Sequence, residues 1–207
     1  MTILPSTYLP SIEWMMHLLR GDAVIDIGEN YVKRSERNRA KIMSANGVLD
    51  LSVHLKDANR PRTPIHSIEI DYSKRWQHQH WMAILSAYKN SPYFDHFAPY
   101  LEPHFNREYK HLWELNTELL KSLLKLMGAS VELNFSRDYV VATEQDIDLR
   151  PKLRGELSTP MPEYTQVFYD REPFVKNLSI LDMLLCEGRG TMPLLQHSIT
   201  AMGESRD

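Results

Sequence analysis

The stretch GENYVKRSERNRAKIMSANGVLDLSVHL, residues 28–55, carries the strongest local folding signal in the chain. Asn46 and Gly47 stand between two runs that are rich in apolar residues, and two-residue hairpin turns favour Asn-Gly because both residues tolerate positive φ. We therefore predict two antiparallel strands, from Lys41 to Ala45 and from Val48 to Leu55. The second strand alternates apolar and polar residues, which is typical of a strand with one buried face.

The segment before this hairpin is locally cationic. Its basic residues are Lys33, Arg34, Arg37, Arg39 and Lys41, and its acid is Glu36. Arginine holds phosphate or carboxylate through paired N–H donors, and lysine supplies a point charge. We therefore predict an anion-binding site made by Lys33, Arg37 and Arg39. We include their neighbours Glu29, Tyr31 and Asn38 in this site; Glu29 and Tyr31 would orient the cations, and a purely structural role is the alternative for each. A solvated surface segment without a ligand is the alternative interpretation.

The first thirty residues predict a strand, a helix and a second strand. Residues 2–4 form a short extended piece, Ser11 can cap a helix that starts at Ile12, and the run from Ala23 to Ile27 is typical of a buried strand. If these strands are parallel neighbours, the loops that follow them lie at one edge of the sheet. Open α/β sheets bind ligands at that edge, and the cationic segment begins there.

The remaining residues predict further strands and helices. We expect strands at 65–72, 131–135, 139–142 and 164–169, helices at 73–89, 106–126 and 179–186, and a long loop at 143–162. This order predicts an α/β fold, with mixed α+β as the alternative. We expect a single domain over residues 1–207 with a small mixed sheet, one β-hairpin and several packed helices. The C-terminal part would close over the same edge and end in a frayed tail at 202–207.

Composition limits the classes of protein to which the chain can belong. With 207 residues, 43% of them hydrophobic and 25% charged, it is a soluble globular protein. The net charge of −3 argues against a nucleic-acid binder, whose domain would be basic. A single cysteine, Cys186, excludes an intrachain disulfide and suits a reducing cytoplasm. No stretch approaches the roughly 20 apolar residues of a membrane span, and the N-terminus does not read as a signal peptide.

Two residues outside the cationic segment are candidates for catalysis. His80 lies on a predicted helix, and an imidazole ordinarily titrates near neutral pH, which suits proton transfer; a hydrogen-bonded packing residue is the alternative. Asp182 lies in an apolar helix, where a carboxylate needs a partner, and we expect a buried Arg or His. We predict no metal site, because His78 and His80 would point about 200° apart on one helix. No glycine-rich phosphate loop is present, so the sequence leaves the cofactor unknown.

The order of several short motifs resembles one family. The motifs are Pro10-Ser11-Ile12, Glu29-Asn30-Tyr31, Lys33, Arg37-Asn38-Arg39, Asn46-Gly47, His80-Trp81, Ser91-Pro92-Tyr93-Phe94, Gln166-Val167-Phe168 and Asn177-Leu178-Ser179-Ile180-Leu181-Asp182. In this pattern the chain is similar to the WbqC-like family of bacterial proteins. Longer relatives have a Pro-x-x-Gly-Tyr turn near the start, where this chain has residues 10–14, PSIEW.

The resemblance implies a role in surface-polysaccharide (O-antigen) biosynthesis. The implied reaction is transfer of an acyl or aminoacyl group onto an activated sugar, with a nucleotide sugar or another phosphorylated small molecule as substrate. The cationic segment would then hold the phosphate, and His80 would transfer the proton. The alternative is a non-catalytic ligand-binding or assembly protein of the same pathway.

Overall fold

The computed structural model describes residues 1–56, 60–151 and 161–204. Most of the predicted loop after residue 151, and the last residues of the predicted tail, lie outside these ranges. Within them, strands β1 (Thr2–Pro5) and β2 (Ala23–Asp26) are parallel neighbours joined by helix α1 (Ile12–Leu19). The register pairs Thr2 with Ala23 and Pro5 with Asp26, so both strands end at the same edge of the sheet. The predicted strand–helix–strand unit is therefore confirmed.

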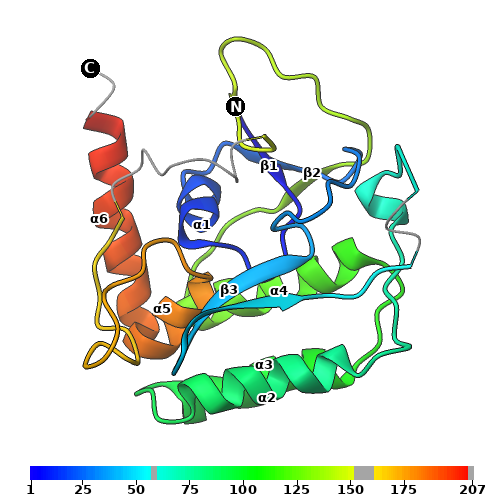
Figure 1. Cartoon of the computed structure of the whole chain (residues 1–207). Helices are drawn as coiled ribbons and strands as arrows, with labels where there is room; N and C mark the ends of the chain where they lie inside the picture. Colours follow the sequence, from blue (N-terminus) through cyan, green and yellow to red (C-terminus); the bar gives the residue numbers. More distant parts are fainter. Residues whose placement is uncertain (57–59, 152–160, 205–207) are drawn as a thin grey trace.

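Two short strands complete this parallel sheet. β5 (Asn134–Ser136) pairs with β2, and β6 (Ile147–Asp148) pairs with β1, which gives the order β5-β2-β1-β6 (Figure 1). The antiparallel hairpin forms a separate two-stranded sheet, so parallel and antiparallel pairing are divided between two sheets. The α/β class is confirmed.

The hairpin consists of β3 (Arg39–Ser44) and β4 (Gly47–Ser52). Ser44 pairs with Gly47 next to the turn, and Gly47 has a φ of +92°, a conformation that glycine adopts without steric cost. Leu51 is buried, as the alternation predicts, whereas Val48 and Leu49 remain partly exposed near the turn.

The middle of the chain supplies three helices. α2 (Trp76–Tyr88) and α3 (Phe94–Asn106) lie side by side below the hairpin in Figure 1, and α4 (Leu112–Met127) packs against α3. The amide of His111 donates to Glu114 at 3.0 Å to cap α4, and Gly128 ends the helix in a left-handed conformation. α2 and α4 correspond to predicted helices.

Three predicted strands are wrong. Residues 65–72 form the 3₁₀ turn η1 (Ile65–Ser67) and two isolated bridges, in which Ile70 faces Leu55 and Glu69 faces His111. Residues 139–142 and 164–169 form no strand in the part of the chain that the structure describes. Apolar side chains in both segments face solvent, since Val141 is 77% and Tyr169 73% exposed.

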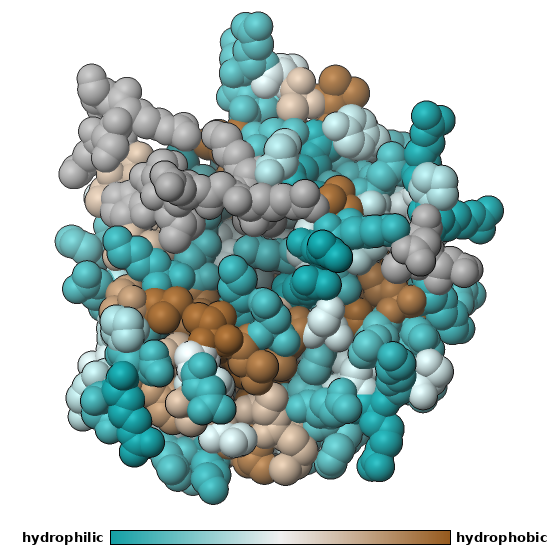
Figure 2. All heavy atoms as spheres, viewed as in Figure 1, coloured by the Kyte–Doolittle hydropathy of each residue, from teal (hydrophilic) through white to brown (hydrophobic). Residues whose placement is uncertain are grey.

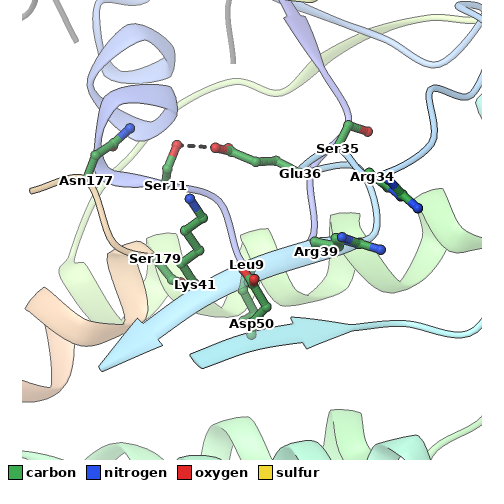
Figure 3. A pocket seen from close by; sticks show the side chains of 11 residues that line it. Leu9, Ser11, Arg34, Ser35, Glu36, Arg39, Lys41, Asp50, Asn177 and Ser179 are labelled. Carbon is green, nitrogen blue, oxygen red and sulfur yellow. Dashed lines mark hydrogen bonds between the residues drawn. The ribbon is translucent and has the colours of Figure 1, made fainter. Parts of the chain in front are cut away.

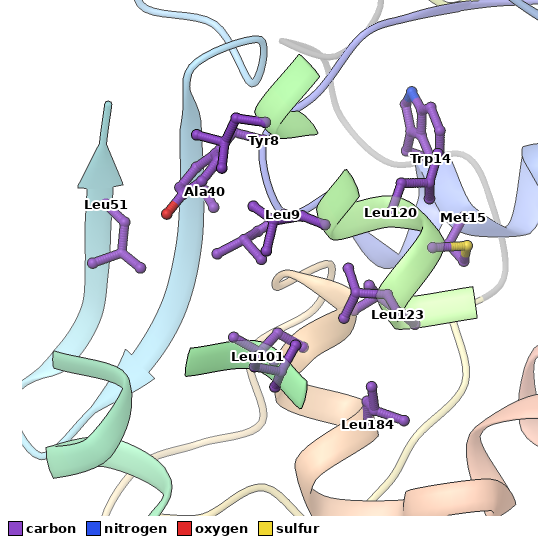
Figure 4. Packing of buried hydrophobic residues seen from close by; sticks show 14 of the residues in the cluster. Tyr8, Leu9, Trp14, Met15, Ala40, Leu51, Leu101, Leu120, Leu123 and Leu184 are labelled. Atoms are coloured by element: carbon purple, nitrogen blue, oxygen red, sulfur yellow. The ribbon is translucent and has the colours of Figure 1, made fainter. Parts of the chain in front are cut away.

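The C-terminal part consists of α5 (Ile180–Glu187), η2 (Gly188–Gly190) and α6 (Thr191–Glu204). α5 is buried over almost its whole length, so it lies in the interior rather than on the surface. Figure 4 shows part of the buried core, which includes Leu9, Met15, Leu51, Leu101, Leu123 and Leu184. Apolar side chains also form a band on one face of the surface (Figure 2). No described helix has both the length and the apolar character needed to cross a bilayer.

Candidate functional site

The carboxyl edge of the parallel sheet is built around Asp26, the last residue of β2. Its side chain is completely buried, and Oδ1 accepts hydrogen bonds from the backbone amides of Gly28 and Glu29, both at 2.9 Å. Oδ2 accepts from Nη1 of Arg150 at 2.5 Å. Arg150 also forks both carboxylate oxygens of Asp148, at 2.9 and 2.7 Å. These bonds tie β2, β6 and the following loop together, so they fix the base of the site.

Glu29 and Arg37 form a buried ion pair on this base. Arg37 is 2% exposed, and it donates from Nε to Oε1 of Glu29 at 2.8 Å and from Nη2 to Oε2 at 2.5 Å. Burial raises the pKa of Glu29, and the Arg37 guanidinium opposes that rise. Because the fork of Arg37 is engaged with Glu29, these two predicted anion-site residues bind each other.

Tyr31 and Asn38 hold the hairpin in place. The hydroxyl of Tyr31 donates to Oδ1 of Asn38 at 2.9 Å, and Nδ2 of Asn38 donates to the carbonyl of Val53 at 2.9 Å. Lys33 is exposed on the turn between these two residues. Of the predicted anion-site residues, only Arg39 lines the cavity described next.

A cavity of about 280 Å³ opens beside this base, between the loop after β1, the cationic segment and the segment before α5. Its lining residues are Leu9, Ser11, Arg34, Ser35, Glu36, Arg39, Ala40, Lys41, Asp50, Asn177 and Ser179 (Figure 3). The C-terminal part therefore does close over this edge. Ligand sites of α/β proteins lie in the same place relative to their sheets.

Three of the lining residues have a strained backbone. Leu9, Arg34 and Asn177 adopt φ values of +44°, +55° and +57°. Non-glycine residues rarely adopt this conformation, which costs about 1–3 kcal/mol and occurs most often at functional sites. Arg62 is the one other described non-glycine residue with positive φ. Strain is thus concentrated around the cavity.

Glu36 lines the cavity and has a pKa close to neutral pH. Burial raises its pKa to about 7; the Ser11 hydroxyl, which donates to Oε2 at 3.0 Å, opposes the rise, as do Lys41 and Arg37, while Glu13 adds to it. A carboxylate with such a pKa can accept and release a proton under physiological conditions. This residue is the acid that interrupts the cationic run in the sequence.

The cavity also holds cations. Arg34, Arg39 and Lys41 line it, against the acids Glu36 and Asp50. Nε of Arg39 is buried and has no hydrogen-bond partner among the described residues. In Figure 3 the side chain of Lys41 extends from β3 towards Ser11. An unsatisfied buried guanidinium nitrogen is costly, and an anionic ligand would satisfy it.

His80 lies outside this cavity, with both ring nitrogens engaged. Nε2 accepts from the backbone amide of Ser52 at 3.1 Å, and Nδ1 lies 2.9 Å from the hydroxyl of Tyr8. Burial lowers the pKa of His80 to about 4, so the ring is neutral at pH 7. Because Nε2 accepts a hydrogen bond, the proton of the neutral ring is on Nδ1, and Nδ1 donates a hydrogen bond to the hydroxyl of Tyr8. In this arrangement His80 ties β4 to the loop after β1.

Asp182 is completely buried on α5, and its partners are tyrosines rather than the expected Arg or His. Oδ1 accepts from the hydroxyl of Tyr88 at 2.6 Å, and Oδ2 accepts from Tyr164 at 2.5 Å. Burial raises the pKa of Asp182, and the two tyrosine hydroxyls oppose that rise. Tyr88 in turn accepts from the backbone amide of Met43 at 3.0 Å. Asp182 therefore anchors β3 to α5, and it does not line the cavity.

The described residues include no group of three or more His, Cys, Asp or Glu side chains arranged to hold a metal ion. The polar cavity residues that sequence reasoning did not assign to the site are Ser11, Arg34, Ser35, Glu36, Lys41, Asp50, Asn177 and Ser179. Arg34, Glu36 and Lys41 belong to the cationic segment and were within reach of the sequence. Asn177 and Ser179 belong to a motif of the family resemblance, whereas Asp50 gave no signal beyond strand alternation.

Comparison with known proteins adds one finding. The model of a family described as the WbqC-like protein family matches residues 6–155, which is more than half of the chain. The match includes the loop after β1, the cationic segment and the hairpin, but not Asn177 and Ser179. Neither the curated proteins nor the solved structures contain a match to the chain.

Proposed function

The chain belongs to the WbqC-like protein family, and from this premise we propose that it is a transferase of bacterial surface-polysaccharide biosynthesis. It would transfer an acyl or aminoacyl group to an activated sugar, with the cavity at the sheet edge as its active site. The observation that carries the proposal is the meeting of three cations with one carboxylate of near-neutral pKa in a cavity lined by strained backbone.

The cations would hold the phosphorylated part of a substrate. Arg39 supports this role best, because its buried Nε has no partner among the described residues. Arg34 and Lys41 would add charge on either side. Arg37, which is paired with Glu29, would act as a support behind the site. The ligand class is then a nucleotide sugar or another phosphorylated small molecule.

Glu36 would act as the general base. A hydroxyl or amino group of the acceptor sugar must lose a proton as it attacks an acyl carbonyl, and a base with a pKa near 7 accepts that proton most effectively. We assign proton transfer to Glu36 rather than His80, because both nitrogens of His80 are occupied. A cytoplasmic location is part of the proposal, and a chain with a single cysteine suits that reducing compartment.

Thermal unfolding in the presence of nucleotide sugars, acyl-coenzyme A or inorganic pyrophosphate tests binding. We expect at least one class to raise the Tm, and Arg39→Gln to reduce the shift. The control is Arg189→Gln, because Arg189 is exposed and does not line the cavity. If no ligand raises the Tm of the wild-type protein, the proposal fails.

Glu36→Gln then separates an enzyme from a binding protein. With the ligand found by thermal unfolding, an enzyme would keep binding and lose turnover by about 10²–10⁴-fold. A non-catalytic binding protein would show no turnover in either form. Turnover that survives in Glu36→Gln would remove Glu36 from the mechanism.

A further inference from the structure

Ser11 differs from the other two serines of the cavity in what its hydroxyl does. The hydroxyl of Ser35 donates to the carbonyl of Val32, and that of Ser179 accepts from the amide of Leu181 as the cap of α5. Both therefore serve the backbone. The hydroxyl of Ser11 instead donates to a carboxylate oxygen of Glu36 at 3.0 Å (Figure 3). A hydroxyl aimed at a base is the arrangement that activates a nucleophile.

The position of Ser11 makes this orientation unexpected. Ser11 is the N-cap of α1, where a serine side chain normally accepts from an amide of the first helical turn. It makes no such bond here. Oδ1 of Asn177, a residue far away in sequence, accepts from the amide of Glu13 at 2.9 Å instead. Asn177 does so from a strained backbone conformation. Asn177 thus caps α1 in place of Ser11, and the Ser11 hydroxyl remains directed at Glu36.

The backbone around Ser11 is held on both sides. The amide of Ile12 donates to Leu178 at 3.0 Å, and the amide of Ile180 donates to Pro10 at 2.8 Å. Ser11 and Ser179 form an antiparallel bridge at this point. A nucleophile gains rate from being fixed beside its base. Lys41 points towards the same hydroxyl, so its ammonium is available to negative charge that develops there.

We propose that Ser11 is the nucleophile of a two-step acyl transfer in which Glu36 is the base. The proposal rests on the proposed function and specifies its mechanism as well as its donor class, an acyl thioester of a phosphorylated carrier. In the first step Ser11 Oγ attacks the carbonyl carbon of the donor. A C–O bond forms, the C–S bond breaks, and the proton of Oγ passes through Glu36 to the leaving thiolate.

The second step regenerates the protein. The acceptor hydroxyl or amine attacks the carbonyl of the ester on Ser11, and its C–O or C–N bond forms as the ester bond to Oγ breaks. Glu36 takes the proton of the acceptor and returns it to Ser11 Oγ. No oxidant, reductant or metal ion enters the balance.

Acylation by p-nitrophenyl acetate, a donor that needs no carrier, tests the assignment. The protein is quenched with acid at short times, its intact mass is measured, and the modified peptide is sequenced. We expect one acetyl group on Ser11 in the wild-type protein and in Ser35→Ala, the matched control. Ser11→Ala should lack it, and Glu36→Gln should acquire it at least ten times more slowly.

A second variant guards against misfolding of Ser11→Ala. Ser11→Cys keeps a small nucleophilic side chain, and we expect acetylation of the introduced thiol. The absence of an adduct at position 11 in both the wild-type protein and Ser11→Cys overturns the proposal, and so does equal labelling of Ser11→Ala. Binding of phosphorylated ligands is measured separately by thermal unfolding, so a direct transfer that uses Glu36 alone would survive that result.

Discussion

Arg37 and Arg39 stand two positions apart and have opposite surroundings. An extended chain would place both on one face, but residues 33–38 form turns, and β3 begins only at Arg39. Arg37 consequently turns inward to Glu29, and Arg39 lines the cavity. Composition identified the cationic segment. Which of the two arginines lines the cavity, and which pairs with Glu29, depends on the turns at residues 33–38.

Arg37→Met should destabilise the protein strongly. The substitution leaves the carboxylate of Glu29 buried without its partner, and breaking a buried ion pair in this way costs roughly 3–5 kcal/mol. Urea denaturation measures the loss. Arg39→Met is the matched control, with an expected change within about 1 kcal/mol. Unaltered stability of Arg37→Met would show that the pair does not hold the fold.

Glu36 should make stability depend on pH. Its pKa in the folded protein, about 7, lies above the ordinary value of 4.5, so folding favours the protonated form. The buried carboxylate therefore lowers the free energy of unfolding by its full amount above pH 7, and this loss disappears as the pH falls towards 4.5. Glu36→Gln should therefore be more stable than the wild-type protein by roughly 2–3 kcal/mol at pH 8, and this advantage should vanish near pH 4.5.

For His80→Gln, the stability difference from the wild-type protein should change with pH in the opposite direction. Burial lowers the pKa of His80 from 6.5 to about 4, so the wild-type protein loses stability as the pH falls through this window. Relative to the wild-type protein, His80→Gln should therefore gain stability with falling pH, while Glu36→Gln loses its advantage. Urea denaturation at pH 8, 6 and 4.5 distinguishes the two. A pH-independent difference for Glu36→Gln would refute the raised pKa.

Helix α1 depends on Asn177, which lies in a different part of the chain. Asn177→Gly keeps the left-handed backbone but removes the cap of the Glu13 amide, and we expect a loss of about 1 kcal/mol. Asn177→Ala should cost about 1 kcal/mol more, because alanine also resists the positive φ. Urea denaturation of both variants separates the two contributions. Equal losses would mean that the backbone conformation carries no strain.

The elements that the sequence predicts correctly are those whose determining residues lie within the element itself. The Asn46-Gly47 turn and the helix ending at Gly128 each contain the residues that determine them. Helix α3 was missed, because Pro99 and Pro103 lie inside it. Both prolines are on its exposed side, where water can satisfy the carbonyls that lose an amide partner. Its buried residues Phe94, Leu101 and Phe105 do follow helical spacing.

The molecule as a whole assembles its cavity from segments that are distant in sequence. The loop after β1, the cationic segment, β4 and residues 177–179 all contribute lining side chains. Sequence reasoning placed a site at the carboxyl edge of the sheet and named Arg39. It did not find the Ser11–Glu36 bond, because that contact depends on where α5 and Asn177 hold the start of α1. The roles expected of His80 and Asp182 required both residues to meet the cationic segment at one site, and neither lines the cavity.

Binding of an anion in the cavity is the central claim, and amide chemical shifts measured during a titration with inorganic pyrophosphate test it directly. We expect saturable shifts at residues 34–41 and 177–179. Arg39→Gln should lower the affinity for pyrophosphate that these shifts report at least tenfold, and the control Arg189→Gln should leave this affinity unchanged. Unmoved amides in these two segments, or shifts confined to other parts of the protein, would contradict the account.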